Sequence, residues 1–181
     1  MRLFIATTFP IDVLEELNRQ ITLIKSKLPS ASWVRPETQH LTFEFLGEQD
    51  EAVVGRIQID GGASFEASLR GCGFFPHARQ PRVGWAGVEP KERFVAVAQH
   101  VRDAVRAAGL EPDKKAFKPH LTLMRLRDRW PAPAVELFEK TVGDYQSAPF
   151  TVDRVTLYSS KLSPKGATHT ALKTFTLSSR A

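Results

Sequence analysis

The fold is decided by two stretches of sequence, QHLTFEFL at residues 39–46 and KPHLTLMRL at residues 118–126. Each is rich in apolar, aromatic and β-branched side chains and follows a stretch with helical spacing, so each predicts a β-strand. Both contain the tripeptide His-Leu-Thr, at residues 40–42 and 120–122. This repetition indicates an internal duplication, with one His-Leu-Thr strand in each of two similar lobes.

The residues around these strands alternate between strand and helix patterns. Apolar side chains recur at steps of three and four from Ile11 to Leu28 and from Phe94 to Ala108, as in amphipathic helices. A short helix is expected with the acidic residues Glu48, Asp50 and Glu51 in its first turn and an end before Gly61, and another at 134–142. The further strands that we expect lie at residues 2–8, 64–75, 81–88, 149–159 and 169–177. Without strict βαβ alternation, this order predicts an α+β fold.

We therefore expect two lobes of antiparallel sheet with outer helices and a central cleft. No linker or low-complexity tract divides the chain, so residues 1–181 are expected to form a single bilobal domain.

Composition gives weaker information about function. The chain has 181 residues, a formal net charge of +5 and one cysteine, Cys72, which excludes a disulfide within the chain. The small basic surplus favours anionic ligands. No stretch approaches the roughly 18 consecutive apolar residues of a membrane span. We expect a monomeric cytoplasmic protein without a membrane partner.

Strand parity indicates what each His-Leu-Thr motif presents. Residues i and i+2 of a strand share a face, so His40 and Thr42 project together, while Phe43 and Phe45 project to the opposite face. The second motif repeats this arrangement. Each strand is thus expected to bury one apolar face and to offer an imidazole beside a hydroxyl on the other.

Two such pairs facing one ligand suit the opening of a cyclic phosphate. An attacking water must lose a proton and the leaving ribose oxygen must gain one, and one neutral and one protonated imidazole perform both transfers near neutral pH. Threonine hydroxyls can donate to the phosphate oxygens as their charge grows. The pattern also fits two unrelated strand histidines, one of them hydrogen-bonded in the core.

The sequence resembles the 2H phosphoesterase superfamily, defined by two His-x-(Ser/Thr)-x motifs. It is most similar to the bacterial and archaeal RNA 2′,3′-cyclic phosphodiesterases, also known as 2′-5′ RNA ligase-like proteins. The resemblance covers almost the whole chain. The stretches that carry it are residues 2–10, 33–48, 69–89, 116–127 and 155–172.

The resemblance implies the role of each motif residue. His40 would donate a proton to the leaving 3′ oxygen, and His120 would be the base that activates water. Thr42 and Thr122 would hold the phosphate, and the product would carry a 2′-phosphate. No metal and no cofactor is implied, and the expected partners are RNA ends or nucleotides with a 2′,3′-cyclic phosphate.

The roles of three further residues follow less directly from the two motifs. The resemblance implies that Arg125 binds phosphate, although strand parity places it opposite His120, so this role requires a bulge or a strand end. Phe45 is a candidate to stack on a base, and its alternative is packing in the core. Relatives often carry an aromatic residue, commonly tyrosine, near His169, so the role of the C-terminal loop around His169 stays open.

Other functions remain to be separated from hydrolysis. The same site could join RNA ends without ATP as a 2′-5′ RNA ligase, although water at about 55 M favours hydrolysis by mass action. A non-catalytic RNA-binding module would keep its function without the two histidines. Hydrolysis by a single metal ion is weakly supported, because no clustered carboxylates accompany the histidines.

Overall fold

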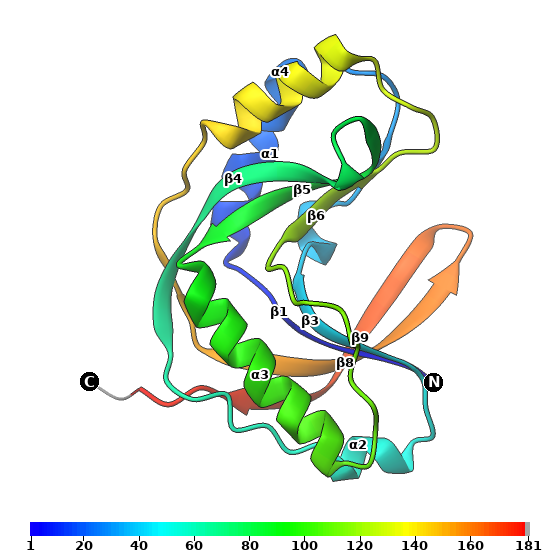
Figure 1. The fold of residues 1–181 in the computed structure, drawn as a ribbon, viewed down its shortest axis with the longest axis vertical. Coiled ribbons are helices and arrows are strands. Elements are labelled where there is room, and N and C mark those ends of the chain that lie inside the picture. The colour runs from blue at the N-terminus through cyan, green and yellow to red at the C-terminus, as the bar shows by residue number, and fades with distance from the viewer. Residues whose placement is uncertain (180–181) are drawn as a thin grey trace.

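The strands of the molecule form two antiparallel sheets, which are described for residues 1–179 in a computed structural model (Figure 1). The first sheet has four strands in the order β3-β1-β8-β9. Their bounds are β1 (Arg2–Thr7), β3 (Leu41–Glu48), β8 (Arg154–Ser163) and β9 (Gly166–Thr176).

The second sheet has five strands in the order β2-β6-β5-β4-β7. Their bounds are β2 (Ser32–Trp33), β4 (Phe65–His77), β5 (Gln80–Glu89), β6 (Leu121–Arg125) and β7 (Phe150–Val152). The predicted α+β fold is confirmed, and each sheet contains one of the two His-Leu-Thr strands.

Residues 1–179 also form four α-helices, namely α1 (Ile11–Lys25), α2 (Ala52–Arg56), α3 (Lys91–Ala107) and α4 (Ala132–Gly143). Helix α1 leaves the first sheet after β1, yet it packs with α4, which contacts β4 of the second sheet. Helix α3 leaves the second sheet after β5 and packs against β3 of the first. The two parts of the chain are therefore interleaved, and buried side chains from both sheets form one continuous core.

The strand boundaries differ from prediction where the chain turns. The expected strand 149–159 is two strands, β7 and β8, which join different sheets. Strands β8 and β9 are joined by a tight turn, in which Ser163 pairs with Gly166. The resulting hairpin projects from the body of the molecule (Figure 1). Within residues 1–179, no helix is long and apolar enough to cross a membrane.

Candidate active site

Each motif histidine lies immediately before its strand and is fixed by the same backbone contact. His40 Nδ1 lies 2.8 Å from the carbonyl oxygen of Thr38, and His120 Nδ1 lies 2.6 Å from that of Lys118. Because a carbonyl oxygen only accepts, Nδ1 must carry the proton in both rings. Each Nε2 is therefore the atom left for proton transfer.

The two motifs approach one another between the sheets. Strands β3 and β6 contact each other although they belong to different sheets. Besides burial, the charge of Arg125 lowers the pKa of both His40 and His120, and the charges of His169 and His120, when these rings are protonated, lower the pKa of His40. The structure thus places both imidazoles and the Arg125 guanidinium within electrostatic reach of one another.

Burial is the largest influence on both histidines. Loss of water around the rings lowers the pKa of His40 and of His120, because the charged imidazolium is the form that loses most solvation. The backbone carbonyls at Thr38 and Lys118 oppose this shift by accepting from the protonated rings. Positive neighbours then lower both values further.

A β-bulge in each motif strand corrects the parity prediction. In β6, Trp85 pairs with Thr122 and Gly84 with Met124, so Leu123 is an extra residue. An extra residue turns those that follow it to the other face. The burial pattern shows this break in alternation. Thr122 is half-buried, the next two residues, Leu123 and Met124, are both buried, and Arg125 is exposed. Arg125 therefore has the bulge that its predicted position beside His120 required.

The same irregularity occurs in β3 and overturns the prediction for Phe45. There Ala6 pairs with Thr42 and Ile5 with Glu44, leaving Phe43 as the extra residue. Phe45 is 68% exposed, so the alternative that it packs in the core is wrong. The prediction that it lies on the face opposite to Thr42 is also wrong, because the bulge turns it to the same face. Phe45 in the first motif thus has the position that Arg125 has in the second.

Aromatic rings surround each histidine, and the two sets differ. Around His40, the ring of Phe4 lies at a centroid distance of 5.0 Å and that of His169 at 5.1 Å. Phe4 also contacts Phe45 and stacks on Tyr158. This group, defined as the Phe4 cluster, extends from β3 across β1 to β8 and β9.

The ring of His120 lies against two side chains of the second sheet. Phe75 meets it edge-on at 4.8 Å and Trp85 lies at 6.2 Å. Trp85 Nε1 and His169 Nδ1 are buried without a hydrogen-bond partner among residues 1–179. Sequence reasoning missed Phe75, Trp85 and Tyr158, since no motif marks them. Their only signal was their place on strands expected to pair with others.

Trp33 and Cys72 both have structural surroundings. Trp33 packs against the core, and Lys25 Nζ lies 5.1 Å from its ring centre. Burial raises the pKa of the Cys72 thiol to about 11, so it is protonated at neutral pH and is not poised as a nucleophile.

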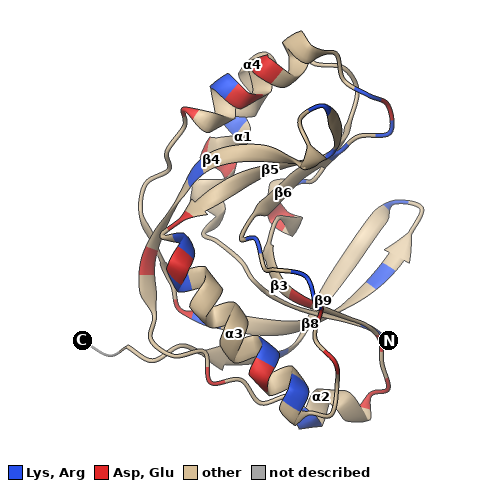
Figure 2. Ribbon diagram, viewed as in Figure 1, with Lys and Arg blue, Asp and Glu red and all other residues tan. Residues whose placement is uncertain are grey.

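Basic residues occur on a hairpin of each sheet and in the loop that follows β6. Figure 2 shows Lys and Arg at the tip of the β4–β5 hairpin, in the loop after β6 and on the β8–β9 hairpin. In the first two segments the exposed arginines are Arg79, Arg82, Arg127 and Arg129. The Arg82 guanidinium donates to the Arg127 carbonyl at 3.0 Å, which joins these two segments.

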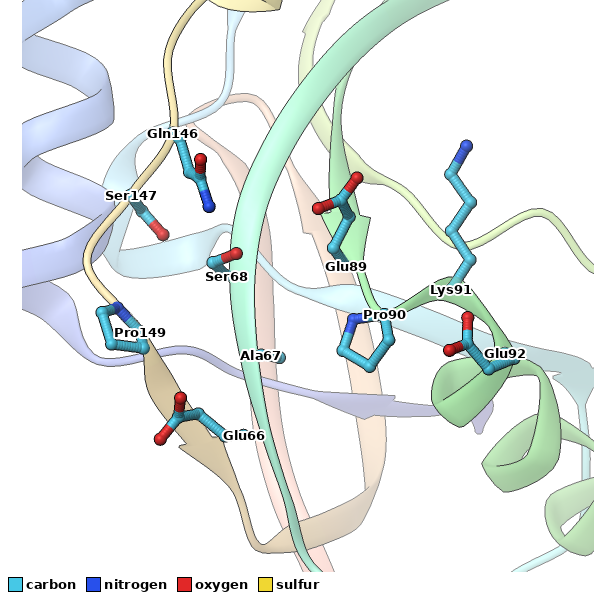
Figure 3. A pocket seen from close by; sticks show the side chains of 10 residues that line it. All are labelled: Glu66, Ala67, Ser68, Glu89, Pro90, Lys91, Glu92, Gln146, Ser147 and Pro149. Carbon is cyan, nitrogen blue, oxygen red and sulfur yellow. The ribbon is translucent and has the colours of Figure 1, made fainter.

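A hollow of about 730 Å³ lies elsewhere on the molecule, along β4 and the start of α3 (Figure 3). Its charged lining is one lysine, Lys91, and three carboxylates, Glu66, Glu89 and Glu92, so it is negative on balance, and no predicted site residue contributes to it. Acidic side chains repel a phosphate, so the hollow does not suit the predicted ligand. In residues 1–179 no three His, Cys, Asp or Glu side chains gather as a metal ion requires.

Comparison with known proteins gives consistent results. A family model described as the 2′-5′ RNA ligase superfamily matches residues 21–163. The chain is 35% identical to the RNA 2′,3′-cyclic phosphodiesterase of Thermotoga maritima, covering 95% of this chain and 93% of that protein. It is also 35% identical to the protein of the same name from Thermus thermophilus, covering 98% and 90% of the two chains.

Solved structures agree with this assignment. A crystal structure of a Thermus thermophilus protein matches with a TM-score of 0.76 at 33% identity over 98% of both chains. Escherichia coli LigT in its apo form shares the fold with a TM-score of 0.71, covering 97% of this chain and 96% of that one at 23% identity. On the family match and these relatives, the chain belongs to the 2′-5′ RNA ligase superfamily of 2H phosphoesterases.

Proposed function

We propose that this protein hydrolyses the 2′,3′-cyclic phosphate at RNA ends to a 2′-phosphate, with His40 and His120 as its acid–base pair. The observation that carries the proposal is the matched pair of imidazoles. In each, Nδ1–H donates to a backbone carbonyl, which leaves Nε2 for proton transfer, and a threonine lies two residues on; each also lies within electrostatic reach of Arg125.

The reaction needs two proton transfers and no other reagent than water. His120 Nε2 takes a proton from water as its oxygen bonds to phosphorus. The bond from phosphorus to the 3′ oxygen breaks, and His40 Nε2–H gives that oxygen its proton. Thr42, Thr122 and Arg125 would donate to the remaining phosphate oxygens, on which negative charge accumulates.

The neighbours of the two histidines support this division of roles. The leaving oxygen belongs to the ribose, so the nucleoside must lie on the side of the acid. The Phe4 cluster is on the His40 side, where Phe45 is 68% exposed and suited to stack on a base. Attack by water then comes from the His120 side.

The distribution of charge favours RNA over an isolated nucleotide. The exposed arginines of the β4–β5 tip and of the loop after β6 lie on segments next to the second motif, where further phosphates of a strand would find cations. The relatives that match are named for RNA. Escherichia coli LigT has been crystallised with 3′-AMP, a nucleotide with a terminal phosphate.

The proposal is tested with purified protein in excess EDTA and an RNA that ends in a 2′,3′-cyclic phosphate. The wild type should open the ring to a 2′-phosphate. His40→Ala and His120→Ala should each lose about 10²–10⁴-fold in rate, the usual contribution of one general acid or base. The exposed His77→Ala is the matched control and should keep wild-type activity.

The same experiment separates the alternatives. Loss of activity in EDTA that returns with a divalent cation would indicate metal-dependent hydrolysis. Binding of RNA without ring opening, unchanged in both histidine variants, would indicate a binding module. Adding an RNA with a free 5′-hydroxyl and finding mainly a joined product would favour 2′-5′ ligation.

A further inference from the structure

We infer that His169 is a positioning residue for His40, holding its imidazole edge-on at the orientation needed for proton donation. The inference rests on the proposed function and goes beyond it, because His169 lies outside both His-Leu-Thr motifs. His169 lies on β9, the strand at one edge of the first sheet. His40 directly precedes β3, the strand at the opposite edge of the same sheet.

The contact is made by two rings on the His40 side of the sheet. The His169 ring lies 5.1 Å from that of His40 at 83° and 4.9 Å from that of Phe4 at 75°. His40 is thus in contact with Phe4 on one side and His169 on another, while the Thr38 carbonyl fixes its Nδ1. Edge-to-face pairs at such distances are favourable, so together these contacts restrict rotation of the His40 ring.

His169 contacts His40 in its neutral, unprotonated form. Its Nδ1 is buried with no acceptor among residues 1–179, and an imidazolium needs an acceptor for both N–H groups. Burial accordingly lowers the pKa of His169. A neutral ring excludes water from His40 without adding a positive charge beside it at neutral pH.

The second motif has a matching ring of different chemistry. Phe75 meets His120 at 4.8 Å and 90°, nearly the geometry of His169 with His40. Phe75 has no titratable group, yet its position beside His120 is equivalent to that of His169 beside His40. The feature that the two motifs share is an aromatic edge against the imidazole, so the ring of His169 is what holds His40.

The groups that face His40 define what His169 adds. Phe4 has no titratable group; the charged or titratable side chains that act on His40 are Arg125 of β6, His120 just before β6 and His169 of β9. Removing the His169 ring would let water reach His40 and would remove one positive neighbour at acidic pH. Both changes raise the pKa of His40 toward its ordinary value of about 6.5.

The test compares His169→Ala and His169→Phe with Thr170→Ala, a control at the exposed next residue, which faces the other side of β9. For each variant, kcat and KM are measured from pH 5 to 9 on RNA ending in a cyclic phosphate. The pKa of His40 is measured by NMR titration of its ring without substrate. Thermal unfolding identifies any variant that is not folded, and His169→Gln replaces the alanine variant in that case.

His169→Ala should lower kcat by about tenfold with little change in KM, as a misplaced acid does. The NMR pKa of His40 should rise, and the alkaline limb of the pH–rate profile should move upward with it. His169→Phe should restore kcat to within about threefold of wild type, since it restores the ring edge.

Two results would overturn the inference. Either His169→Ala matches Thr170→Ala in kcat and in the His40 pKa, or His169→Phe is as impaired as His169→Ala, which would assign the role to a ring nitrogen. A wild type that does not open cyclic phosphates refutes the proposed function instead. The NMR comparison then still decides whether His169 holds His40.

Discussion

At the scale of single residues, the two motifs are nearly identical in sequence and distinct in their surroundings. Both histidines donate Nδ1–H to the carbonyl two residues before, and both threonines are followed by a bulge. After the bulge the motifs diverge, with Phe45 in one and Arg125 in the other. The proposed acid–base pair would thereby have one side suited to a base and another suited to phosphate.

Replacing Phe45 should separate substrate binding from stability. Phe45→Ala removes a ring on which a base would stack, a contact worth about 1–3 kcal/mol, so KM for RNA should rise about 5- to 100-fold with a smaller change in kcat. The free energy of unfolding should change by less than about 0.5 kcal/mol, since the Phe45 side chain is 68% exposed. Leu23→Ala, on an equally exposed apolar side chain of α1, is the control. An unchanged KM would refute base stacking on this ring.

The buried imidazoles should make stability depend on pH. His40, His120 and His169 all have a lowered pKa in the folded protein, chiefly through burial. Between those values and about 6.5 the unfolded chain binds more protons, so the free energy of unfolding falls as pH falls through this range and levels off below it. Their full contribution is present only above about pH 7.

Thermal unfolding from pH 8 to pH 5 checks this expectation. A variant with glutamine at residues 40, 120 and 169 should lose less stability over that range than the wild type does. Equal slopes in the two proteins would show that these imidazoles do not control the acid side of the stability profile.

At the scale of elements, the helices and most strands could be predicted from the sequence and the bulges could not. The spacing of apolar residues over 11–28 and 94–108 follows from which face of a helix is buried, and this is a local property. A bulge depends on the partner strand. Phe43 and Leu123 are extra only because β1 and β5 pair around them, so parity counted along one strand placed Phe45 on the wrong face.

The contact of Trp85 with Gly73 shows how the partner strands shape the site. The indole of Trp85 lies on Gly73, where an added Cβ would come within 2.3 Å of the ring. The same indole neighbours His120, and the backbone of Trp85 pairs with Thr122. Any side chain at residue 73 would therefore have to move the ring beside the second motif.

Gly73→Ala should consequently destabilise the protein by about 1–3 kcal/mol and lower kcat as well. Gly55→Ala is the matched control, because a Cβ there meets nothing within 4 Å and lies in α2, where alanine should stabilise by up to about 1 kcal/mol. Chemical denaturation and steady-state rates measure both effects. Wild-type stability in Gly73→Ala would mean that the indole is not fixed by this contact.

At the scale of the whole molecule, a buried carboxylate connects β3 of the first sheet to α3 and to the segment that leads into β6 of the second sheet. Glu44 of β3 has a side chain only 1% exposed, and it pairs with Arg102 of α3 at 3.4 Å. Its other oxygen accepts from the backbone N–H of Asp113, on the segment that leads to His120. From the sequence alone Glu44 is a charged residue in an apolar strand. Its partners come from the interleaving of the chain, which no local pattern records.

Removing this carboxylate should cost stability and should also disturb the second motif. The free energy of unfolding of Glu44→Ala should fall by about 2–4 kcal/mol. The loss should be slightly smaller than for breaking a fully buried ion pair, because Arg102 is 18% exposed and also donates to the Lys115 carbonyl. Glu44→Gln keeps an acceptor for Asp113 N–H and should lose about 1–2 kcal/mol. Glu48→Ala, an exposed carboxylate of the same strand, should change unfolding by at most about 1 kcal/mol.

A double-mutant cycle with Arg102→Ala decides whether the pair couples the sheets. If Glu44 and Arg102 act together, the double variant should lose less than the sum of the single variants by about 0.5–3 kcal/mol. Because residues 113–118 lead into His120, Glu44→Ala should also lower kcat at temperatures where the protein is folded. Additive losses with unchanged kcat would show that β3 and the approach to His120 are positioned independently, and that the two motifs face one another without this connection.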